Sequence, residues 1–193
     1  MSVLRSLAPG LLLAAPRLGD PNFERTVVLL ARHDETGALG WVINGRSAGA
    51  VGDLLENSRL LPEGVSPPRN AAFSRVARVG GPVSPESGWV LYPRGETALP
   101  GEMDVGETLA VTGDLEALRQ VILDGRDNFR LFVGYAGWSP GQLEGEVRAG
   151  VWLPADVDAS LVLTDADDLW ELAYRRTIGA APGAFVSTRG GSA

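Results

Sequence analysis

An apolar run near the N-terminus, TVVLLA at residues 26–31, leaves little choice of secondary structure. Aliphatic, β-branched residues without polar alternation are typical of a strand that is buried on both faces. Turn residues follow at 34–37 (DETG), and a second apolar run occupies residues 39–43. Together these segments predict a β-hairpin between residues 24 and 43.

Other segments predict the elements that would complete the fold. Short apolar runs predict strands at residues 11–15, 73–79, 89–92, 108–111, 151–153 and 159–163. Helical spacing predicts four helices: residues 51–57, a helix capped by Asp114, one that Gly150 closes, and residues 165–178 up to Gly179. Hairpins and scattered helices without regular βαβ alternation indicate an α+β fold with a mixed, curved sheet.

A length of 193 residues is typical of one domain. We expect that domain to span residues 1–179. Residues 180–193 are rich in Gly, Pro and Ser, which predicts a disordered tail.

Composition narrows the chemistry. The chain has no cysteine, and all 17 basic residues are arginine, so thiol nucleophiles and lysine Schiff bases are excluded. A net charge of −7 disfavours wholesale binding to nucleic acid or to an anionic membrane. Pro9 and Gly10 interrupt the N-terminal apolar stretch and Pro16 follows it, which argues against a signal peptide. We expect a cytoplasmic protein that does not enter membranes and needs no cofactor or metal.

The sequence GWSPG at residues 137–141 has the spelling of a hydrolase nucleophile elbow. The residue after the serine is Pro140, which lacks the N–H that the oxyanion hole needs, and the only histidine lies far upstream. A helix start explains the motif better: Ser139 as N-cap, Pro140 at N1, Gln142 closing a capping box, and Trp138 with Leu143 as a hydrophobic staple. We therefore reject a catalytic serine.

Other polar and glycine residues allow both a functional and a structural interpretation. His33 could be a general base or ligand, although a hydrogen bond at the end of the hairpin is commoner. Gly80-Gly81 could form an anion-binding nest or a tight turn. A basic stretch with Arg69, Arg75 and Arg78 could contact nucleic acid or an acidic partner, or could be solvated strand charges.

Five ordered blocks carry a family resemblance: PGLL at residues 9–12 with Asp20 and Phe23, GALGWVIN at 37–44 after His33, GGPV at 80–83 leading to GWVLY, GYAGW at 134–138 leading to GQLEGE, and Trp152 with Trp170. In these blocks, from about residue 9 to residue 179, the chain resembles the YqgE/AlgH family of bacterial proteins. The resemblance implies a mostly antiparallel, bifurcated sheet curled into a pseudo-barrel with about four flanking helices. It implies no settled activity, although the label of transcriptional regulator has been attached to the family. A ligand site in such a protein would be sought at these residues: Asp20, His33, Asn44, Gly80, Gly81, Trp138 and Gln142.

Three hypotheses for the function stay open. The leading one is a non-enzymatic binding or regulatory module with an unknown protein or small-molecule partner. The second is a small-molecule-binding protein or enzyme with a pocket near His33 and Gly80-Gly81. The third is a transcriptional regulator that contacts DNA through Arg69, Arg75 and Arg78; no helix-turn-helix is legible in the sequence.

Overall fold

Ten strands and five helices form the part of the chain that the structure describes. This computed structural model describes residues 6–16, 23–57, 73–123 and 128–179, so Asp20, Arg69 and the tail at 180–193 lie outside it. The strands are β1 (Gly10–Ala14), β2 (Val27–Asp34), β3 (Gly37–Val42), β4 (Ser47–Ala50), β5 (Val76–Val79), β6 (Val83–Pro93), β7 (Met103–Val105), β8 (Leu109–Thr112), β9 (Arg130–Trp138) and β10 (Trp152–Ala155). The helices are α1 (Val51–Asn57), α2 (Leu115–Leu123), α3 (Gln142–Arg148), α4 (Ala159–Val162) and α5 (Leu169–Ile178).

The hairpin that the apolar run predicts is confirmed as β2 and β3. The two strands pair antiparallel, and the Thr36 amide donates to the Asp34 carboxylate in the turn at 2.8 Å. Residues 27–30 are fully buried, because the sheet curls and packs helices against the inner face of β2 while α3 and its neighbours cover the outer face. The run thus lies where its composition requires.

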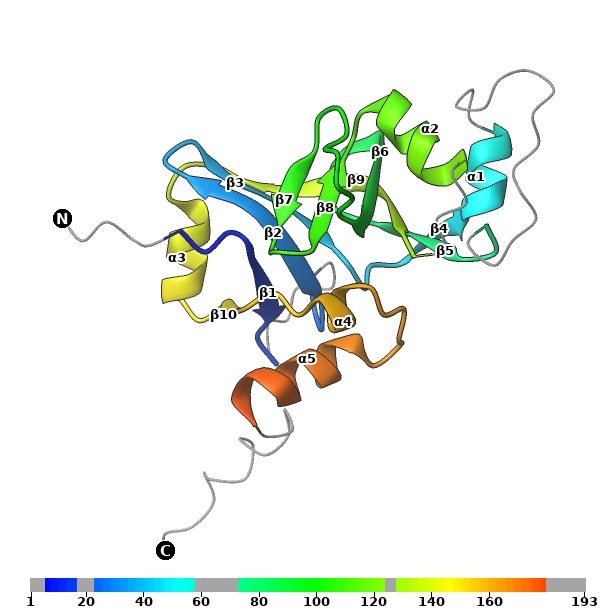
Figure 1. Cartoon of the computed structure of the whole chain (residues 1–193). Coiled ribbons are helices and arrows are strands. Elements are labelled where there is room, and N and C mark those ends of the chain that lie inside the picture. Colours follow the sequence, from blue (N-terminus) through cyan, green and yellow to red (C-terminus); the bar gives the residue numbers. More distant parts are fainter. Residues whose placement is uncertain (1–5, 17–22, 58–72, 124–127, 180–193) are drawn as a thin grey trace, which may run out of the picture.

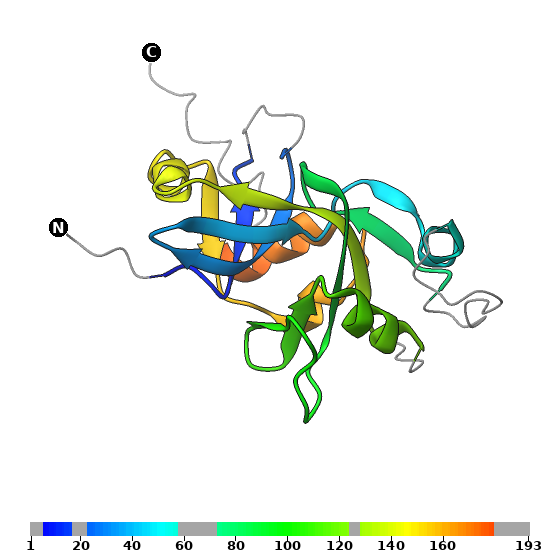
Figure 2. The same ribbon diagram turned by 90° about the horizontal axis from the view of Figure 1, so that it is seen from above.

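Strand β9 is the branch point of the sheet. The strand order is β10-β1-β2-β3-β9-β6-β8-β7, and β5 joins β9 beside β3 while pairing with β4 on its other edge. β3 pairs with residues 136–138 of β9, and β5 pairs with residues 132 and 133. The β5–β9 pairing is parallel, and the other pairings between described strands are antiparallel. The expected mostly antiparallel, bifurcated sheet is therefore confirmed, and it curls into a half-barrel (Figures 1 and 2).

Glycines make the branch possible. From β5 to β6 the chain crosses β9, and the Gly80 amide donates to the Val133 carbonyl at 2.8 Å while the Gly80 carbonyl accepts from Val42. A Cβ on Gly81, whose φ is 155°, would lie 2.2 Å from the Tyr135 carbonyl oxygen, and one on Gly134 would lie 2.6 Å from the Gly81 oxygen. Backbone therefore packs directly on backbone here, and no side chain fits between the two segments.

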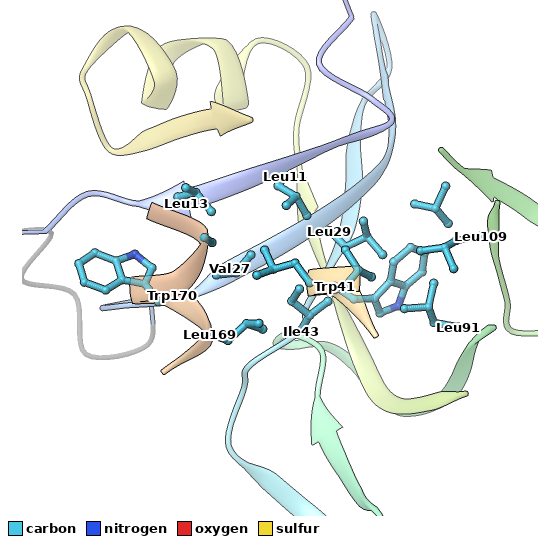
Figure 3. Packing of buried hydrophobic residues seen from close by; sticks show 14 of the residues in the cluster. Leu11, Leu13, Val27, Leu29, Trp41, Ile43, Leu91, Leu109, Leu169 and Trp170 are labelled. Carbon is cyan, nitrogen blue, oxygen red and sulfur yellow. The ribbon is translucent and has the colours of Figure 1, made fainter. Parts of the chain in front are cut away.

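The helices cover the sheet at three places. α4 and α5 lie under the inner face, where Leu169 and Trp170 meet side chains from β1, β2 and β3 (Figure 3). α1 and α2 lie at one end of the molecule and α3 at the other (Figures 1 and 2). The Trp170 indole also donates to the Ala14 carbonyl at 2.9 Å, which fixes α5 to β1.

Helix α4, which was not among the four predicted helices, corrects one prediction. Residues 159–163 were expected to form a strand, but residues 159–162 are the helix α4. Asp158 causes the difference: its carboxylate accepts from the amides of Ser160 and Leu161, which is the N-cap interaction that starts a helix. Leu161 and Val162 are both buried although they are adjacent, which a half-buried strand would not allow.

The last helix also begins later than predicted. α5 starts at Leu169 instead of Asp165, and it ends as predicted at Gly179, which adopts the left-handed conformation with a φ of 74°. Asp165 is drawn out of the helix because Arg78 donates to its carboxylate through Nε and Nη2, at 3.1 and 2.6 Å. An ion pair between distant segments thus overrides a local helix signal.

Candidate functional site

The GWSPG segment folds as a strand end followed by a turn. Trp138 is the last residue of β9, and the Gln142 amide donates to the Ser139 carbonyl at 3.0 Å. Gly141 has φ 77° and ψ −8°, so Pro140 and Gly141 occupy the central positions of a type II turn, which suits both residues. Ser139 is therefore not the N-cap; that position belongs to Gly141, which makes no side-chain cap.

Part of the predicted helix start is nevertheless present. The Gln142 side-chain oxygen accepts from the Ser139 amide at 3.0 Å, which is one half of a capping box. Trp138 and Leu143 are both buried in one apolar cluster, as a staple pair would be. The proline and the glycine move the start of the helix by two residues, because the N-cap is Gly141 instead of Ser139 and the first helical residue is Gln142 instead of Pro140.

A cleft of about 270 Å³ opens beside this turn, between the end of β9, α3 and β10. Its polar wall is Glu146, whose carboxylate accepts three side-chain hydrogen bonds. The indoles of Trp138 and Trp152 donate to Oε2 at 2.9 and 2.7 Å, and the side-chain amide of Gln142 donates through Nε2 to Oε1 at 2.9 Å. Gln142 and Glu146 are four residues apart and so face the same side of α3. The cleft is lined by Phe23, Pro82, Ala136, Gly137, Trp138, Gln142, Glu146, Val151 and Trp152.

Three aromatic rings form the apolar wall of the cleft. The rings of Trp138 and Trp152 meet edge to face, with centroids 6.1 Å apart and planes at 80°. Phe23 meets Trp152 in the same way, at 5.7 Å and 79°. Such contacts fix the rings relative to one another. The three rings therefore pack against one another as one wall of the cleft.

Glu146 has no cationic partner among the described residues. The ion pairs of the described part join other carboxylates to arginine or histidine, and the three donors on Glu146 are neutral. Neutral donors bond to the carboxylate oxygens without supplying a counter-charge. Among the described residues, the cleft consequently holds one carboxylate without a cationic partner, beside an aromatic wall.

His33 lies outside this cleft, and within the described residues one of its ring nitrogens, Nδ1, has a hydrogen-bond partner. Nδ1 accepts from the Leu7 amide at 3.0 Å, and Nε2 lies 3.3 Å from a carboxylate oxygen of Glu144 on α3. The Ser6 hydroxyl donates to the His33 carbonyl at 3.0 Å. The ring therefore joins the N-terminal segment and α3 to the end of β2, and its partner at Nδ1 is remote rather than local to the hairpin.

Asn44 and the glycine pair likewise hold the backbone together. The Asn44 side chain accepts from the Val27 amide at 2.7 Å and donates to the Arg25 carbonyl at 2.8 Å, so it ties the start of β2 to the end of β3. Gly80 and Gly81 cross β9. Of the seven residues of the expected ligand site, the structure brings Trp138 and Gln142 into one cleft, does not place His33, Asn44, Gly80 or Gly81 in its lining, and leaves Asp20 undescribed.

The basic residues of the predicted stretch have partners in the fold. Arg75 donates to the Phe129 carbonyl at 3.1 Å, and Arg78 pairs with Asp165. Sequence reasoning missed their neighbour Arg130, which is buried at the start of β9, and it missed Glu146 as the centre of the cleft. The Gln142–Glu146 spacing next to a strand that ends in tryptophan was the available signal for Glu146.

The half-barrel sheet with its aromatic cleft defines the class: an α+β protein built on one bifurcated sheet. Among solved structures, the solution structure of the AlgH protein from Pseudomonas aeruginosa matches with a TM-score of 0.75 at 29% identity, covering 100% of this chain and 99% of that one. The crystal structure of protein DIP2367 from Corynebacterium diphtheriae matches with a TM-score of 0.70 over 94% of this chain and 93% of that one; at 23% identity it supports the fold alone.

Sequence comparison gives the family. A family model described as AlgH-like matches residues 11–181. A UPF0301 protein from Myxococcus xanthus is 39% identical over 97% of this chain and 99% of its own length, and one from Anaeromyxobacter sp. is 40% identical over 96% and 95%. The chain belongs to this AlgH-like family of bacterial proteins, as the resemblance implied. None of these names states an activity. Within the described residues, no helix is long and apolar enough to cross a membrane.

Proposed function

We propose that this chain is a non-enzymatic, cytoplasmic binding or regulatory protein that takes up a small organic cation, such as an amine, in the Glu146 cleft. The observation that carries the proposal is the carboxylate of Glu146, without a cationic partner among the described residues, beside the rings of Trp138, Trp152 and Phe23. Negative charge and aromatic walls are the two features by which proteins recognise ammonium groups.

The size of the cleft and the hydrogen bonds to Glu146 support this class of ligand. A cleft of about 270 Å³ holds a small metabolite, not a peptide or a nucleic acid segment. Two indole N–H groups and one amide hold Glu146 in place, so its charge needs no rearrangement when a cation arrives. A cation that contacts the carboxylate and an aromatic ring gains about 1–3 kcal/mol from the two contacts together.

The alternative hypotheses receive less support from the geometry. A pocket at His33 and Gly80-Gly81 would need free polar groups, but His33 Nδ1 already accepts from the Leu7 amide and the Gly80 amide already donates to the Val133 carbonyl. DNA binding through Arg75 and Arg78 would need Arg78 to leave Asp165, in a chain whose net charge is −7. A regulatory role for the protein would act through the ligand of the cleft.

The test uses benzyltrimethylammonium as the probe, with benzyl alcohol and benzoate as neutral and anionic counterparts. The indole ¹H–¹⁵N resonances of Trp138 and Trp152 report binding directly, because both N–H groups contact Glu146. We expect saturable shifts with the cation and about tenfold weaker binding of the neutral and anionic probes. Equal binding of all three probes, or no saturable shift with the cation, would refute the proposal.

Two variants separate the charge of Glu146 from its structural role. Glu146→Gln keeps an acceptor for the indoles but removes the charge, so we expect at least tenfold weaker binding of the cation with the fold intact. Glu116→Gln is the matched control, because it changes the net charge equally on α2, at the other end of the molecule (Figure 1). Equal loss in both variants would contradict a local role of Glu146.

A further inference from the structure

A second cavity lies at the opposite end of β9 from the aromatic cleft. It has a volume of about 150 Å³, and its wall comes from the start of β9, the residues around the start of β5, Val51 of α1, and the segment after α4. It is lined by Val51, Arg75, Val76, Phe129, Arg130, Leu131, Leu163 and Asp165. The two cavities share no lining residue.

The charge at this cavity is positive. Arg75, Arg130 and Asp165 line the cavity. The Asp165 carboxylate pairs with Arg130 and also with Arg78, which lies beside the cavity. Counting the described residues at the cavity, three arginines against one aspartate give a local charge of +2, in a chain whose net charge is −7. A concave site of this sign concentrates anions.

Arg130 supplies a fixed, buried part of this charge. Its guanidinium donates to the carbonyls of Val162 and Thr164 through Nη1 and to the Ile43 carbonyl through Nη2, and Asp165 lies 3.5 Å from Nη2. Burial lowers the pKa of Arg130 to about 10; Asp165 opposes this effect, and the charges of Arg78 and Arg75 add to it. The charges of Arg78 and Arg75 thus act on Arg130 in the opposite sense to the charge of Asp165.

Arg75 supplies donors that remain available. One nitrogen, Nη1, donates to the Phe129 carbonyl, which fixes the side chain at the cavity wall. Within the described residues, Arg75 has no carboxylate partner and no acceptor for its Nε and Nη2 groups. A guanidinium that is fixed at one nitrogen and open at the others can take an oxyanion in the bidentate manner typical of arginine.

We propose that this arginine cavity binds a small oxyanion of the phosphate class, as inorganic phosphate or as the phosphate group of a small metabolite. Arg75 makes the direct contact, while Arg130 and Arg78 provide the field. The volume is about five times the 30 Å³ that one water occupies, enough for a phosphate group but not for a nucleotide chain. This site is independent of the proposed function of the aromatic cleft.

The test titrates the full chain with inorganic phosphate at constant ionic strength, and it follows the Arg75 Nε–Hε resonance and the melting temperature. We expect saturable binding that raises the melting temperature. Arg75→Gln should weaken binding at least tenfold, and Arg75→Lys, which keeps the charge but not the fork, about threefold. Arg32→Gln is the matched control, because Arg32 is exposed on β2 and pairs with Asp34 outside the cavity. Equal affinity of Arg75→Gln and Arg32→Gln overturns the proposal.

A variant that is expected to strengthen phosphate binding separates the effect of charge from the effect of misfolding. Asp165→Asn raises the charge of the cavity by one, so phosphate should bind at least threefold more tightly at low salt, whereas a damaged fold would bind more weakly. Weaker binding by folded Asp165→Asn overturns the proposal. A single-stranded and a duplex oligonucleotide form a further arm. If either binds through Arg75 while inorganic phosphate and ribose 5-phosphate do not, the site serves nucleic acid and the small-oxyanion assignment is wrong.

Discussion

Replacing Asn44 by alanine tests whether this residue is a structural clamp or a ligand-binding residue. Its side chain accepts from the amide of Val27, a residue with no exposed surface, and donates to the Arg25 carbonyl at the surface. Truncation leaves the Val27 amide buried without a partner, which costs about 1–3 kcal/mol. The Arg25 carbonyl can turn to water, so its loss adds a few tenths of a kcal/mol. We expect the free energy of unfolding to fall by about 2 kcal/mol.

Urea unfolding followed by tryptophan fluorescence measures this change, with the midpoint as the readout and a common m-value. The melting temperature should fall by roughly 4–8 °C for a chain of this size. Asn44→Asp keeps the acceptor for Val27 but loses the donor to Arg25, so it should be less destabilising than Asn44→Ala. Asn57→Ala removes one exposed bond to the Asp53 carbonyl at the end of α1 and should cost under about 0.5 kcal/mol.

A loss below about 0.5 kcal/mol for Asn44→Ala would refute this reasoning, since the buried amide would then have found another partner. Unchanged stability together with lost ligand binding would instead assign Asn44 to a binding surface. The residue would then act as the family resemblance suggested and not as a tie between β2 and β3.

Three further outcomes follow from single positions. Gly81→Ala should prevent folding, because the added Cβ would lie 2.2 Å from the Tyr135 carbonyl oxygen, and a circular dichroism melt without a cooperative transition would show it. Gly145→Ala should raise the free energy of unfolding by about 0.5–1 kcal/mol, because this position is inside α3 with open space around the new methyl; a lower melting temperature would contradict the described environment. The pKa of Asp158 is lowered in the folded protein, chiefly by the hydrogen bond from the Ser160 hydroxyl and also by the bond from the Leu161 amide and by Arg176. The stability that the ionised Asp158 contributes is therefore present above the unfolded-state pKa of 3.8 and is lost as the pH falls through the lowered folded-state pKa. Asp158→Asn should therefore flatten the acid limb of the stability curve below about pH 4, and identical limbs would exclude this role.

Sequence reasoning found the segments whose structure is local. The run at residues 26–31, the helix at Val51–Asn57 and the stop at Gly179 depend on burial and dihedral preferences of the residues themselves. Sequence reasoning failed where contact with a residue distant in the sequence determines the local structure. Asp165 leaves the last helix because Arg78 and Arg130 lie across from it, and nothing within four residues of Asp165 reveals this.

The candidate sites show the same division. Trp138 and Gln142 could be named because a recognisable motif contains them, but Phe23 and Trp152 join them only through the folded sheet. The carboxylate of Glu146 stands out only once its three neutral donors are known. Which charged groups pair depends on the folded structure, so a carboxylate without a cationic partner cannot be recognised in the linear sequence.

The position of β1 has a consequence for how the chain must fold. β1 is hydrogen-bonded on one side to β2 and on the other to β10, so residue 11 pairs with residues 29 and 155. During synthesis β2 is available to pair with β1 early, whereas β10 emerges only when most of the chain has left the ribosome. The free edge of β1 stays open for that whole interval, and its closure by β10 brings together residues as far apart in the sequence as 11 and 155. Folding should accordingly be slow and complete only after synthesis, because non-local pairing of this kind limits the rate at which a sheet forms.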